Sequence, residues 1–397
     1  MPAIEIRPDI YWIGVNDRTT DLFEGLWPVT SEGVSYNAYL VKGKKNALID
    51  MAKDIKSETL ISQISQVIDP SELDYIIINH MEPDHTGVLR SLRRIAPNVK
   101  LYCSKRAHKL IVNYYNITEG IHTVEDGETL DLGHLKLQFF LTPMVHWPET
   151  MVTYETTHQV LFSCDAFGGY GALQGTIFDD QCNFPSFYER EALRYYANIV
   201  ALFPRPVLKA IEKLKDVPIS VVAPSHGLIW RKNPGRIIEL YQKWANYALE
   251  GPEPGVTLIY GTMYGNTEQM VEAVASGVNR AGLPVNVYDV RHIHASYILP
   301  SLYTRNGVLI GAPTYEGALF PPMAHLLDMV ARKKIANRKL AYFGSFGWSG
   351  GARREIANWA EELHWDLVES WEFPGGTPLE ILAQGERMGY KFAESLA

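Results

Sequence analysis

Four side chains that commonly bind metal ions lie within six positions of one another, directly after an apolar strand pattern. The segment is Asp74-Tyr-Ile-Ile-Ile-Asn-His80-Met-Glu82-Pro-Asp84-His85-Thr-Gly87. In an extended loop, His80, Glu82 and Asp84 alternate and point to one side. His85 needs a local bend, which Pro83 stiffens and Gly87 permits. A single metal ion cannot easily use all four donors, so the spacing predicts two metal ions that share this loop.

Three further candidate ligands stand where apolar runs break at glycine or proline, where strand-end loops often carry function. They are His146 in Thr142-Pro-Met-Val-His146-Trp-Pro, Asp165 in Leu161-Phe-Ser-Cys-Asp165-Ala-Phe-Gly-Gly169, and His226 in Val221-Val-Ala-Pro-Ser-His226-Gly227. The complete set contains imidazoles and carboxylates but no thiolate, which favours iron or manganese over a softer ion. Cys164 could bind zinc, but a thiol in this setting is more typical of a small buried residue.

A second region of interest follows the strand pattern Val256–Tyr260. The loop Gly261-Thr262-Met263-Tyr264-Gly265-Asn266-Thr267-Glu268 leads into a helical pattern. Hydroxyl and backbone N–H groups at a helix N-terminus attract a phosphate. The loop has neither the lysine-containing pattern of a nucleoside triphosphate site nor the GxGxxG pattern of a pyrophosphate site. It therefore favours a phosphate monoester.

Two later loops at strand ends contain aromatic side chains and glycines, which could contact the planar ring system of a cofactor. In a doubly wound parallel sheet, the ends of the first, third and fourth strands can flank the switch point, where ligands bind. Tyr264, Tyr315 and Trp348 are the candidate ring contacts. The expected cofactor-binding residues are Thr262, Met263, Tyr264, Gly265, Asn266, Thr267, Pro313, Thr314, Tyr315, Glu316, Ser345, Phe346, Gly347, Trp348, Ser349 and Gly350.

The elements that must position these residues form an α/β protein with two predicted domains, residues 1–250 and 255–397. The segment Leu249-Glu-Gly-Pro-Glu-Pro-Gly255 is rich in glycine and proline and marks the boundary. After it, strand and helix patterns alternate, which predicts a doubly wound parallel sheet covered on both faces. Before it, many short strand patterns precede one long helical stretch, residues 185–215, which predicts two packed sheets covered by helices.

Composition narrows the function classes. Lys and Arg number 37 against 45 Asp and Glu, for a net charge of −8, which argues against nucleic acid as a partner. Cys103, Cys164 and Cys182 form neither a CxxC pair nor an even disulfide set, so a reducing compartment fits. The N-terminus lacks the apolar core of a signal peptide, and no stretch approaches a membrane span in length. We therefore expect a cytoplasmic protein without a membrane partner.

The pattern His80-x-Glu82-x-Asp84-His85, followed by His146, Asp165 and His226, resembles the diiron site of the flavodiiron proteins, or A-type flavoproteins. The likeness covers nearly the whole chain and includes Tyr36-Asn-Ala-Tyr-Leu40, His146-Trp-Pro148, Tyr195-Tyr-Ala-Asn198 and Pro224-Ser-His-Gly227. The resemblance implies a metallo-β-lactamase-like αββα sandwich followed by a flavodoxin-like domain that binds FMN. It also implies that His80, Glu82 and His146 bind one iron, that Asp84, His85 and His226 bind the other, and that Asp165 bridges them.

The same resemblance implies an oxidoreductase that passes electrons through FMN to two irons per chain. There, dioxygen is reduced to water or nitric oxide to nitrous oxide. The electron donor is expected to be a separate molecule, rubredoxin or a reduced deazaflavin, because the chain has no rubredoxin-like CxxC motifs. A head-to-tail homodimer, or a dimer of such dimers, would place the flavin of one subunit beside the irons of the other. Tyr195 and Tyr196 would donate hydrogen bonds near the irons.

Three positions depart from the family pattern. Many members have His at the place of Glu24, Asp at that of Glu149 and Asn at that of Cys164. None of these changes removes a ligand, but Glu24 is expected to line the substrate pocket and to bear on gas preference. His85 is not bound to iron in every member.

Two alternative functions remain. One is a dizinc hydrolase that carries a flavin domain, although the zinc hydrolases of this superfamily usually have His at the place of Glu82. The other is a flavodoxin-like electron carrier whose first domain holds only a structural metal. The carrier would consume neither oxygen nor nitric oxide.

Overall fold

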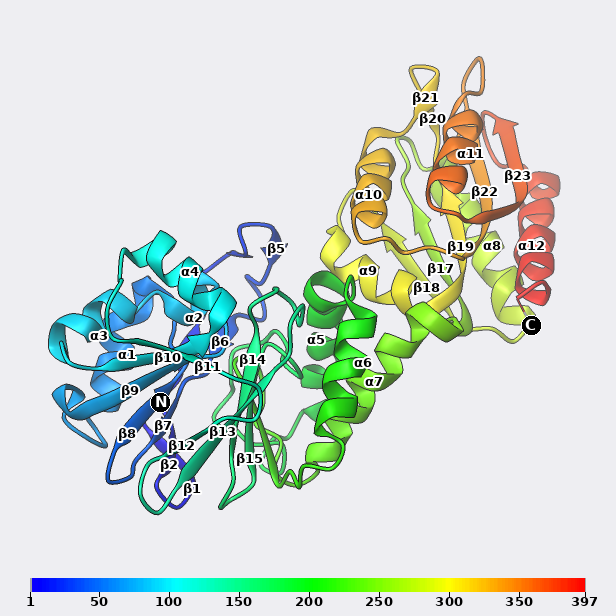
Figure 1. The fold of residues 1–397 in the computed structure, drawn as a ribbon. Coiled ribbons are helices and arrows are strands. Elements are labelled where there is room, and N and C mark those ends of the chain that lie inside the picture. The colour runs from blue at the N-terminus through cyan, green and yellow to red at the C-terminus, as the bar shows by residue number, and fades with distance from the viewer. Residues whose placement is uncertain (1, 397) are drawn as a thin grey trace. The chain divides into compact units, whose positions relative to one another are not determined.

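The computed structural model describes residues 2–396, and the chain divides between Ala245 and Asn246 into two compact units (Figure 1). Each unit contains its own sheets and its own hydrophobic core. The predicted linker is mostly structured, because α7 (Pro234–Glu250) extends into it and β17 (Glu253–Tyr260) begins within it. Gly251 and Pro252 alone separate these two elements. Within residues 2–396, every helix is too short or too polar to cross a lipid bilayer.

The first unit is built on two sheets and two small strand pairs. The seven-stranded sheet has the order β1 (Ile4–Arg7), β2 (Ile10–Trp12), β7 (Tyr39–Val41), β8 (Asn46–Ile49), β9 (Leu73–Ile78), β10 (Lys100–Ser104), β11 (Ile121–Val124). The five-stranded sheet has the order β12 (Thr129–Asp131), β13 (Lys136–Leu141), β14 (Met151–Glu155), β15 (Val160–Cys164), β16 (Val221–Pro224). The separate pairs are β3 (Val15–Asp17) with β6 (Val34–Tyr36), and β4 (Leu22–Phe23) with β5 (Trp27–Pro28).

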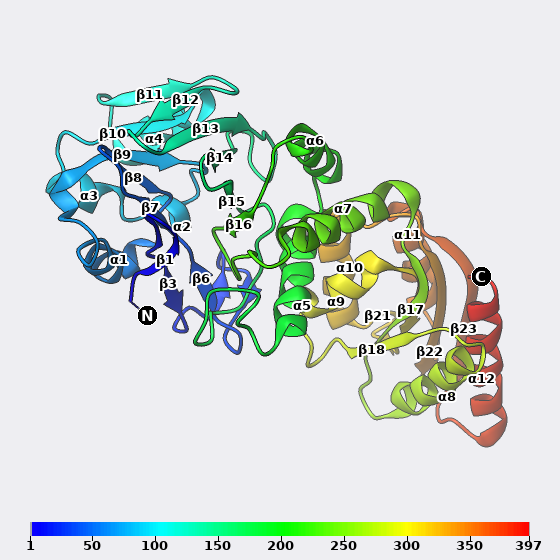
Figure 2. The same cartoon turned by 90° about the horizontal axis from the view of Figure 1, so that it is seen from below.

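Helices cover the outer faces of the two sheets, so that the layers run helix, sheet, sheet, helix (Figure 2). This is the αββα arrangement that the sequence predicts. On the side of the seven-stranded sheet lie η1 (Asp54–Lys56), α1 (Ser57–Ile64), η2 (Pro70–Glu72), α2 (Pro83–Thr86), α3 (Leu89–Ile95) and α4 (Lys105–Tyr115). On the other side lie α5 (Pro185–Tyr195), η3 (Tyr196–Val200), α6 (Pro204–Leu214) and α7.

Parallel strand pairs bring the candidate ligands to one edge of the sandwich. Strands β8, β9 and β10 are parallel, so the loop after β9 leaves the seven-stranded sheet at their carboxyl ends. Strands β15 and β16 are also parallel, so the loops that carry Asp165 and His226 leave the second sheet together. Backbone bonds join these edges, because Met151 N–H donates to the carbonyl of Asn79 and Asn37 N–H to that of Ser225.

The helical stretch predicted as continuous over residues 185–215 is interrupted. Helix α5 ends at Tyr195, a π-helical segment η3 follows, and α6 begins only at Pro204. Proline lacks the N–H that a continuing helix would use, but it fits the first turn of a new one. Segments with π-helical geometry are often found near functional sites.

The second unit has a five-stranded parallel sheet in the order β18 (Val285–Asp289), β17, β19 (Arg305–Gly311), β22 (Lys339–Phe346), β23 (Asp366–Pro374). This is the flavodoxin order, as predicted. The pair β20 (Thr314–Tyr315) and β21 (Ala318–Leu319) extends from it. The helices are α8 (Asn266–Arg280), α9 (Ala295–Thr304), α10 (Pro321–Arg332), α11 (Ala352–Glu362) and α12 (Leu379–Glu394).

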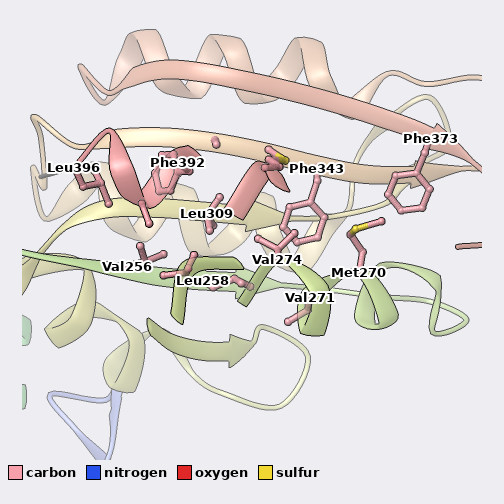
Figure 3. Packing of buried hydrophobic residues seen from close by; sticks show 14 residues of the cluster. Val256, Leu258, Met270, Val271, Val274, Leu309, Phe343, Phe373, Phe392 and Leu396 are labelled. Atoms are coloured by element: carbon pink, nitrogen blue, oxygen red, sulfur yellow. The ribbon is translucent and has the colours of Figure 1, made fainter. Parts of the chain in front are cut away.

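The core beneath α8 and α12 fixes the three loops at the carboxyl ends of this sheet. Val274 of α8 and Phe392 of α12 pack with Leu258, Leu309 and Phe343 from three neighbouring strands (Figure 3). Helices α9, α10 and α11 cover the opposite face (Figure 1). Because both faces are covered, the central strands β17, β19 and β22 contain continuous apolar runs rather than alternating ones.

Candidate metal centre and flavin pocket

All seven predicted ligands converge at one edge of the first unit. His80 lies two residues after the end of β9, Glu82 precedes α2, and Asp84 and His85 lie within α2. His146, Asp165 and His226 come from the loops after β13, β15 and β16. The bend expected for His85 is a single helical turn with Pro83 at its first position. The sequence signal for this turn was the proline, which fits the start of a helix.

The first group of donors is His80, Glu82, His146 and Asp165. Glu82 Oε2 lies 3.2 Å from His80 Nε2 and 3.2 Å from His146 Nε2. Asp165 Oδ2 lies 3.4 Å from each of the same two nitrogens. These four atoms therefore face a common point, as the ligands of one metal ion do.

The second group is Asp84, His85 and His226. Asp84 Oδ1 lies 3.4 Å from His85 Nε2, and Asp84 Oδ2 lies 3.4 Å from His226 Nε2. Asp165 Oδ1 lies 3.2 Å from His85 Nε2 and 3.3 Å from His226 Nε2. Asp165 thus directs one oxygen to each group, which is the placement expected of a bridging carboxylate.

Several of these buried atoms lack ordinary hydrogen-bond partners. Within residues 2–396, both oxygens of Asp84, both oxygens of Asp165 and the Nε2 atoms of His85 and His226 have none. Leaving buried polar atoms unpaired is costly. The donor set therefore fits a pair of metal ions.

The charges of the cluster lead to the same conclusion. Burial alone would raise the pKa of Asp165, but His85, His146 and His226 hold it well below its usual value. Burial opposes protonation of His85, yet Asp84 and Asp165 raise its pKa well above the ordinary value. The Asp165 carboxylate is therefore ionised, and its buried negative charge favours positive charge nearby, which bound metal ions would supply.

Neighbouring groups orient two of the imidazoles. His80 Nδ1–H donates to Glu149 Oε1 at 2.6 Å, and His226 Nδ1–H donates to the carbonyl of Ser35 at 2.7 Å. Both Nε2 atoms therefore carry lone pairs toward the cluster, an arrangement typical of metal-bound histidine. Glu149 accepts the His80 bond at a position where the resemblance leads us to expect the shorter side chain of Asp.

Cys164 stays outside both donor groups. Together with Asp50 and His85 it forms a third set of side chains whose donor atoms are close enough to hold a metal ion. The oxygens of Asp50 accept bonds from the backbone and side-chain nitrogens of Asn79 at 2.9 and 3.0 Å. Burial raises the pKa of the Cys164 thiol well above its ordinary value.

The two adjacent tyrosines differ in position. The ring of Tyr195 lies 5.7 Å from that of His226, and within residues 2–396 its buried hydroxyl has no hydrogen-bond partner. The ring of Tyr196 packs against Tyr241 and Trp244, at 5.1 and 5.5 Å. Of the two, Tyr195 lies beside the cluster.

A pocket of about 250 Å³ opens onto the donor cluster. Its walls are Phe23, Glu24, Gly25, Tyr36, Lys53, Glu82, Pro83 and Asp84. Because Glu82 and Asp84 belong to different donor groups, a small molecule in this pocket would reach both. Glu24 lines the pocket, and its Oε2 accepts a bond from Trp27 Nε1 at 3.1 Å.

The second unit has a pocket of about 390 Å³ at the carboxyl ends of β17, β19 and β22. It is lined by Thr262, Met263, Tyr264, Asn266, Pro313, Thr314, Tyr315, Glu316, Ser345, Phe346, Gly347, Trp348 and Gly375. Gly265, Thr267, Ser349 and Gly350 were also predicted but do not line it. Gly375 was not predicted, because it follows the fifth strand, whose end carried no recognisable pattern.

The pocket has the features that a flavin needs. The side chains of Tyr264 and Trp348 are 91% and 87% exposed, so two aromatic faces are available for stacking. At the start of α8, the Thr262 hydroxyl accepts from Gly265 N–H at 2.9 Å, which tightens the loop. Gly265 has φ of 90°, a conformation that glycine adopts readily. The first-turn amides of α8 remain available for a phosphate.

Comparisons with known proteins agree with both halves of the chain. The family described as ODP family beta lactamase matches residues 34–227, and the Flavodoxin family matches residues 258–387. The anaerobic nitric oxide reductase flavorubredoxin of Pectobacterium carotovorum is 36% identical over 395 residues, which cover 97% of this chain and 77% of that protein.

Two solved structures share the fold over nearly their full length. The rubredoxin oxygen:oxidoreductase of Desulfovibrio gigas has a TM-score of 0.92 at 30% identity, covering 99% of this chain and 98% of that one. The flavodiiron protein of Giardia intestinalis has a TM-score of 0.92 at 26% identity, covering 99% and 96%. The first unit is thus metallo-β-lactamase-like and the second flavodoxin-like.

Proposed function

Because the chain belongs to the flavodiiron protein family, we propose that it is an oxidoreductase that reduces dioxygen, nitric oxide or both at a diiron site, with electrons from FMN. The observation that carries this proposal is the buried seven-donor cluster, in which Asp165 directs one oxygen to each donor group. The names of the relatives, a nitric oxide reductase and an oxygen oxidoreductase, support both gases.

We assign His80, Glu82 and His146 to one iron, Asp84, His85 and His226 to the other, and Asp165 to both. When bound, the irons would supply electrons and open coordination positions for a diatomic gas. The chain itself holds the Asp165 carboxylate ionised, orients His80 and His226 through their Nδ1–H bonds, and provides a small pocket for the gas. We place this chemistry in a domain of residues 1–250.

We assign FMN to the second domain, residues 255–397. A single phosphate suits the first turn of α8, which contains Asn266 and Thr267, and the preceding loop, which contains Thr262. Tyr264, Tyr315 and Trp348 would contact the ring system. The remaining contacts come from the residues that line the 390 Å³ pocket and from Gly265, Ser349 and Gly350 in the same loops.

We propose that a separate rubredoxin supplies the electrons. The names of two relatives, which include rubredoxin, support this donor. A reduced deazaflavin is the alternative donor. We also propose a head-to-tail homodimer, alone or paired into a tetramer, in which each flavin serves the irons of the other subunit. An active monomer in size-exclusion chromatography would contradict the dimer.

The decisive experiment follows oxygen and nitric oxide consumption in parallel under anaerobic handling. The purified protein is reduced with rubredoxin and its reductase, and its iron and flavin contents are measured on the same sample. We expect about two irons and about one FMN per chain, with rapid loss of at least one gas. Zinc in place of iron together with hydrolytic turnover would instead support the dizinc hydrolase. Bound flavin with no consumption of either gas would support the electron carrier.

A further inference from the structure

A short hairpin forms the outer wall of the pocket over the donor cluster. Strands β4 and β5 pair Phe23 with Trp27, and Glu24 and Gly25 make the turn with φ of 52° and 68°. Phe23 is 4% exposed, and its ring stands edge-on to that of His226 with centroids 5.4 Å apart. The pocket lies between this hairpin and the segment Glu82–Asp84. The position of the hairpin therefore determines how open the pocket is.

The backbone of the hairpin is only weakly fixed. Strands β4 and β5 form a two-stranded sheet of their own, joined to neither large sheet. Its turn is closed by the N–H groups of Gly25 and Leu26, which donate to Leu22 and Phe23 within the same hairpin. A two-stranded hairpin is marginally stable by itself in water. Side-chain contacts must therefore hold it against the rest of the unit.

Arg194 of α5 supplies such contacts from the inside. It is 3% exposed, and its Nη1 donates to the carbonyl of Pro28 at the end of β5, at 2.9 Å. Its Nη2 lies 3.4 Å from Glu32 Oε2, four residues further along the chain. Nε donates to Glu191 Oε2 at 2.8 Å, which anchors the guanidinium to its own helix.

The same guanidinium also supports Phe23. It lies 4.4 Å from the centroid of the Tyr170 ring, within cation–π distance. Tyr170 in turn packs edge-on against Phe23 at 5.4 Å and against Tyr195 at 5.2 Å. One buried group thus connects the end of the hairpin, the Glu32 segment and the aromatic residues that surround His226.

We propose that Arg194 is a positioning residue that holds the β4–β5 hairpin closed over the donor cluster and thereby limits access to it. It acts through Pro28, Glu32 and Tyr170. Its role in gas access rests on the proposed function, whereas its hold on the hairpin does not. Lysine cannot replace it fully, because only the planar fork of arginine reaches several acceptors while stacking on a ring.

The first test is amide hydrogen exchange of the folded full-length protein, comparing Arg194→Met with wild type. We expect amides in residues 21–33 to exchange about tenfold faster or more, while those of β9 and β14 keep their protection. Arg236→Met is the matched control, because Arg236 also binds α5, through two 2.9 Å bonds to Glu189, but does not touch the hairpin. It should leave residues 21–33 unchanged.

Two milder variants keep the test decisive if Arg194→Met does not fold. Arg194→Lys retains the charge and should give intermediate acceleration, and Glu32→Gln should give a smaller acceleration confined to residues 21–33. Unchanged exchange of these residues in the folded variants would overturn the proposal. Acceleration spread evenly over the first unit would overturn it too, since that would indicate general destabilisation.

The second test measures azide binding to the iron-loaded protein by its charge-transfer absorption. If the hairpin limits access, Arg194→Met should raise the association rate constant about tenfold at unchanged iron content. An unchanged rate would overturn the role in access. Failure of the wild type to consume either gas would overturn the proposed function, but the hydrogen-exchange result would still decide whether Arg194 holds the hairpin.

Discussion

Replacing single ligands should remove the two metal ions unequally. Glu82 Oε2 lies 3.2 Å from each imidazole of the first group, those of His80 and His146. In Glu82→Ala, the second group keeps Asp84, His85 and His226 together with the Asp165 oxygen that faces it. Loss of an outer-shell partner of a metal ligand typically costs 10–100-fold in affinity, and loss of a ligand itself should cost more. We therefore expect the iron content to fall from about two to about one per chain.

Asp165→Ala should have a larger effect, because its two oxygens face both groups. We expect both irons to bind poorly, with less than about one per chain retained. Glu82→His should shift metal preference toward zinc and abolish reductase activity. The exposed His122, which binds Glu128 at 2.6 Å, provides the control. His122→Gln should retain full iron content.

The assay is metal analysis after anaerobic loading with iron and removal of the excess, combined with flavin content to confirm folding. A Glu82→Ala protein that keeps two irons would refute the division into two donor groups. An Asp165→Ala protein that loses one iron and binds the other normally would refute the bridging role of Asp165. Full reductase activity in Glu82→His would refute the role that we give to this carboxylate.

Three further predictions concern stability and flavin binding. In α12, Gly389→Ala should lower the free energy of unfolding in urea by about 1–3 kcal/mol, because the new methyl group would overlap the Val274 carbonyl of α8. Gly385→Ala should lie within about 1 kcal/mol of wild type, because its methyl group would overlap only the flexible side chain of Met270 and would make an ordinary contact with Val274. Burial alone would raise the pKa of Asp17, but bonds from Thr20, Thr19 and Lys56 hold it well below its usual value. The stabilising effect of Asp17 is therefore present above the ordinary Asp pKa and is lost as the pH falls through the lowered pKa. Asp17→Asn should have a lower free energy of unfolding than wild type at pH 7, and the difference between the two proteins should narrow below about pH 4. A difference that stays constant with pH would contradict this. Trp348→Ala should weaken FMN binding about tenfold in a fluorescence titration, and an unchanged affinity would exclude ring stacking.

The ligands could be found from the sequence because they obey local rules. Four of them lie in one segment after an apolar strand, and the other three stand where apolar runs break at glycine or proline. The strand patterns correctly predicted that the second sheet is parallel and flavodoxin-like.

The hairpin wall and its support could not be predicted in this way. Arg194 and Pro28 are 166 residues apart, and neither has a pattern that indicates the other. In the sequence, nothing distinguishes Arg194 from other charged residues on helices, which usually face solvent. Only the fold reveals that it is buried beneath Tyr170. Contacts of this kind depend on tertiary packing, whereas ligand spacing and turn residues can be recognised within a short segment of the sequence.

The structure also bears on the choice between iron and zinc. A zinc site commonly includes thiolate or additional histidine, and the nearest thiol, Cys164, belongs to neither donor group. It lies beside Asp50, whose oxygens are already occupied by Asn79. The atoms that face the cluster are therefore imidazole nitrogens and carboxylate oxygens alone, and the carboxylate share favours iron. Glu82 is the side chain on which this balance depends, since a histidine in its place would leave the first group with three imidazoles and the one carboxylate of Asp165.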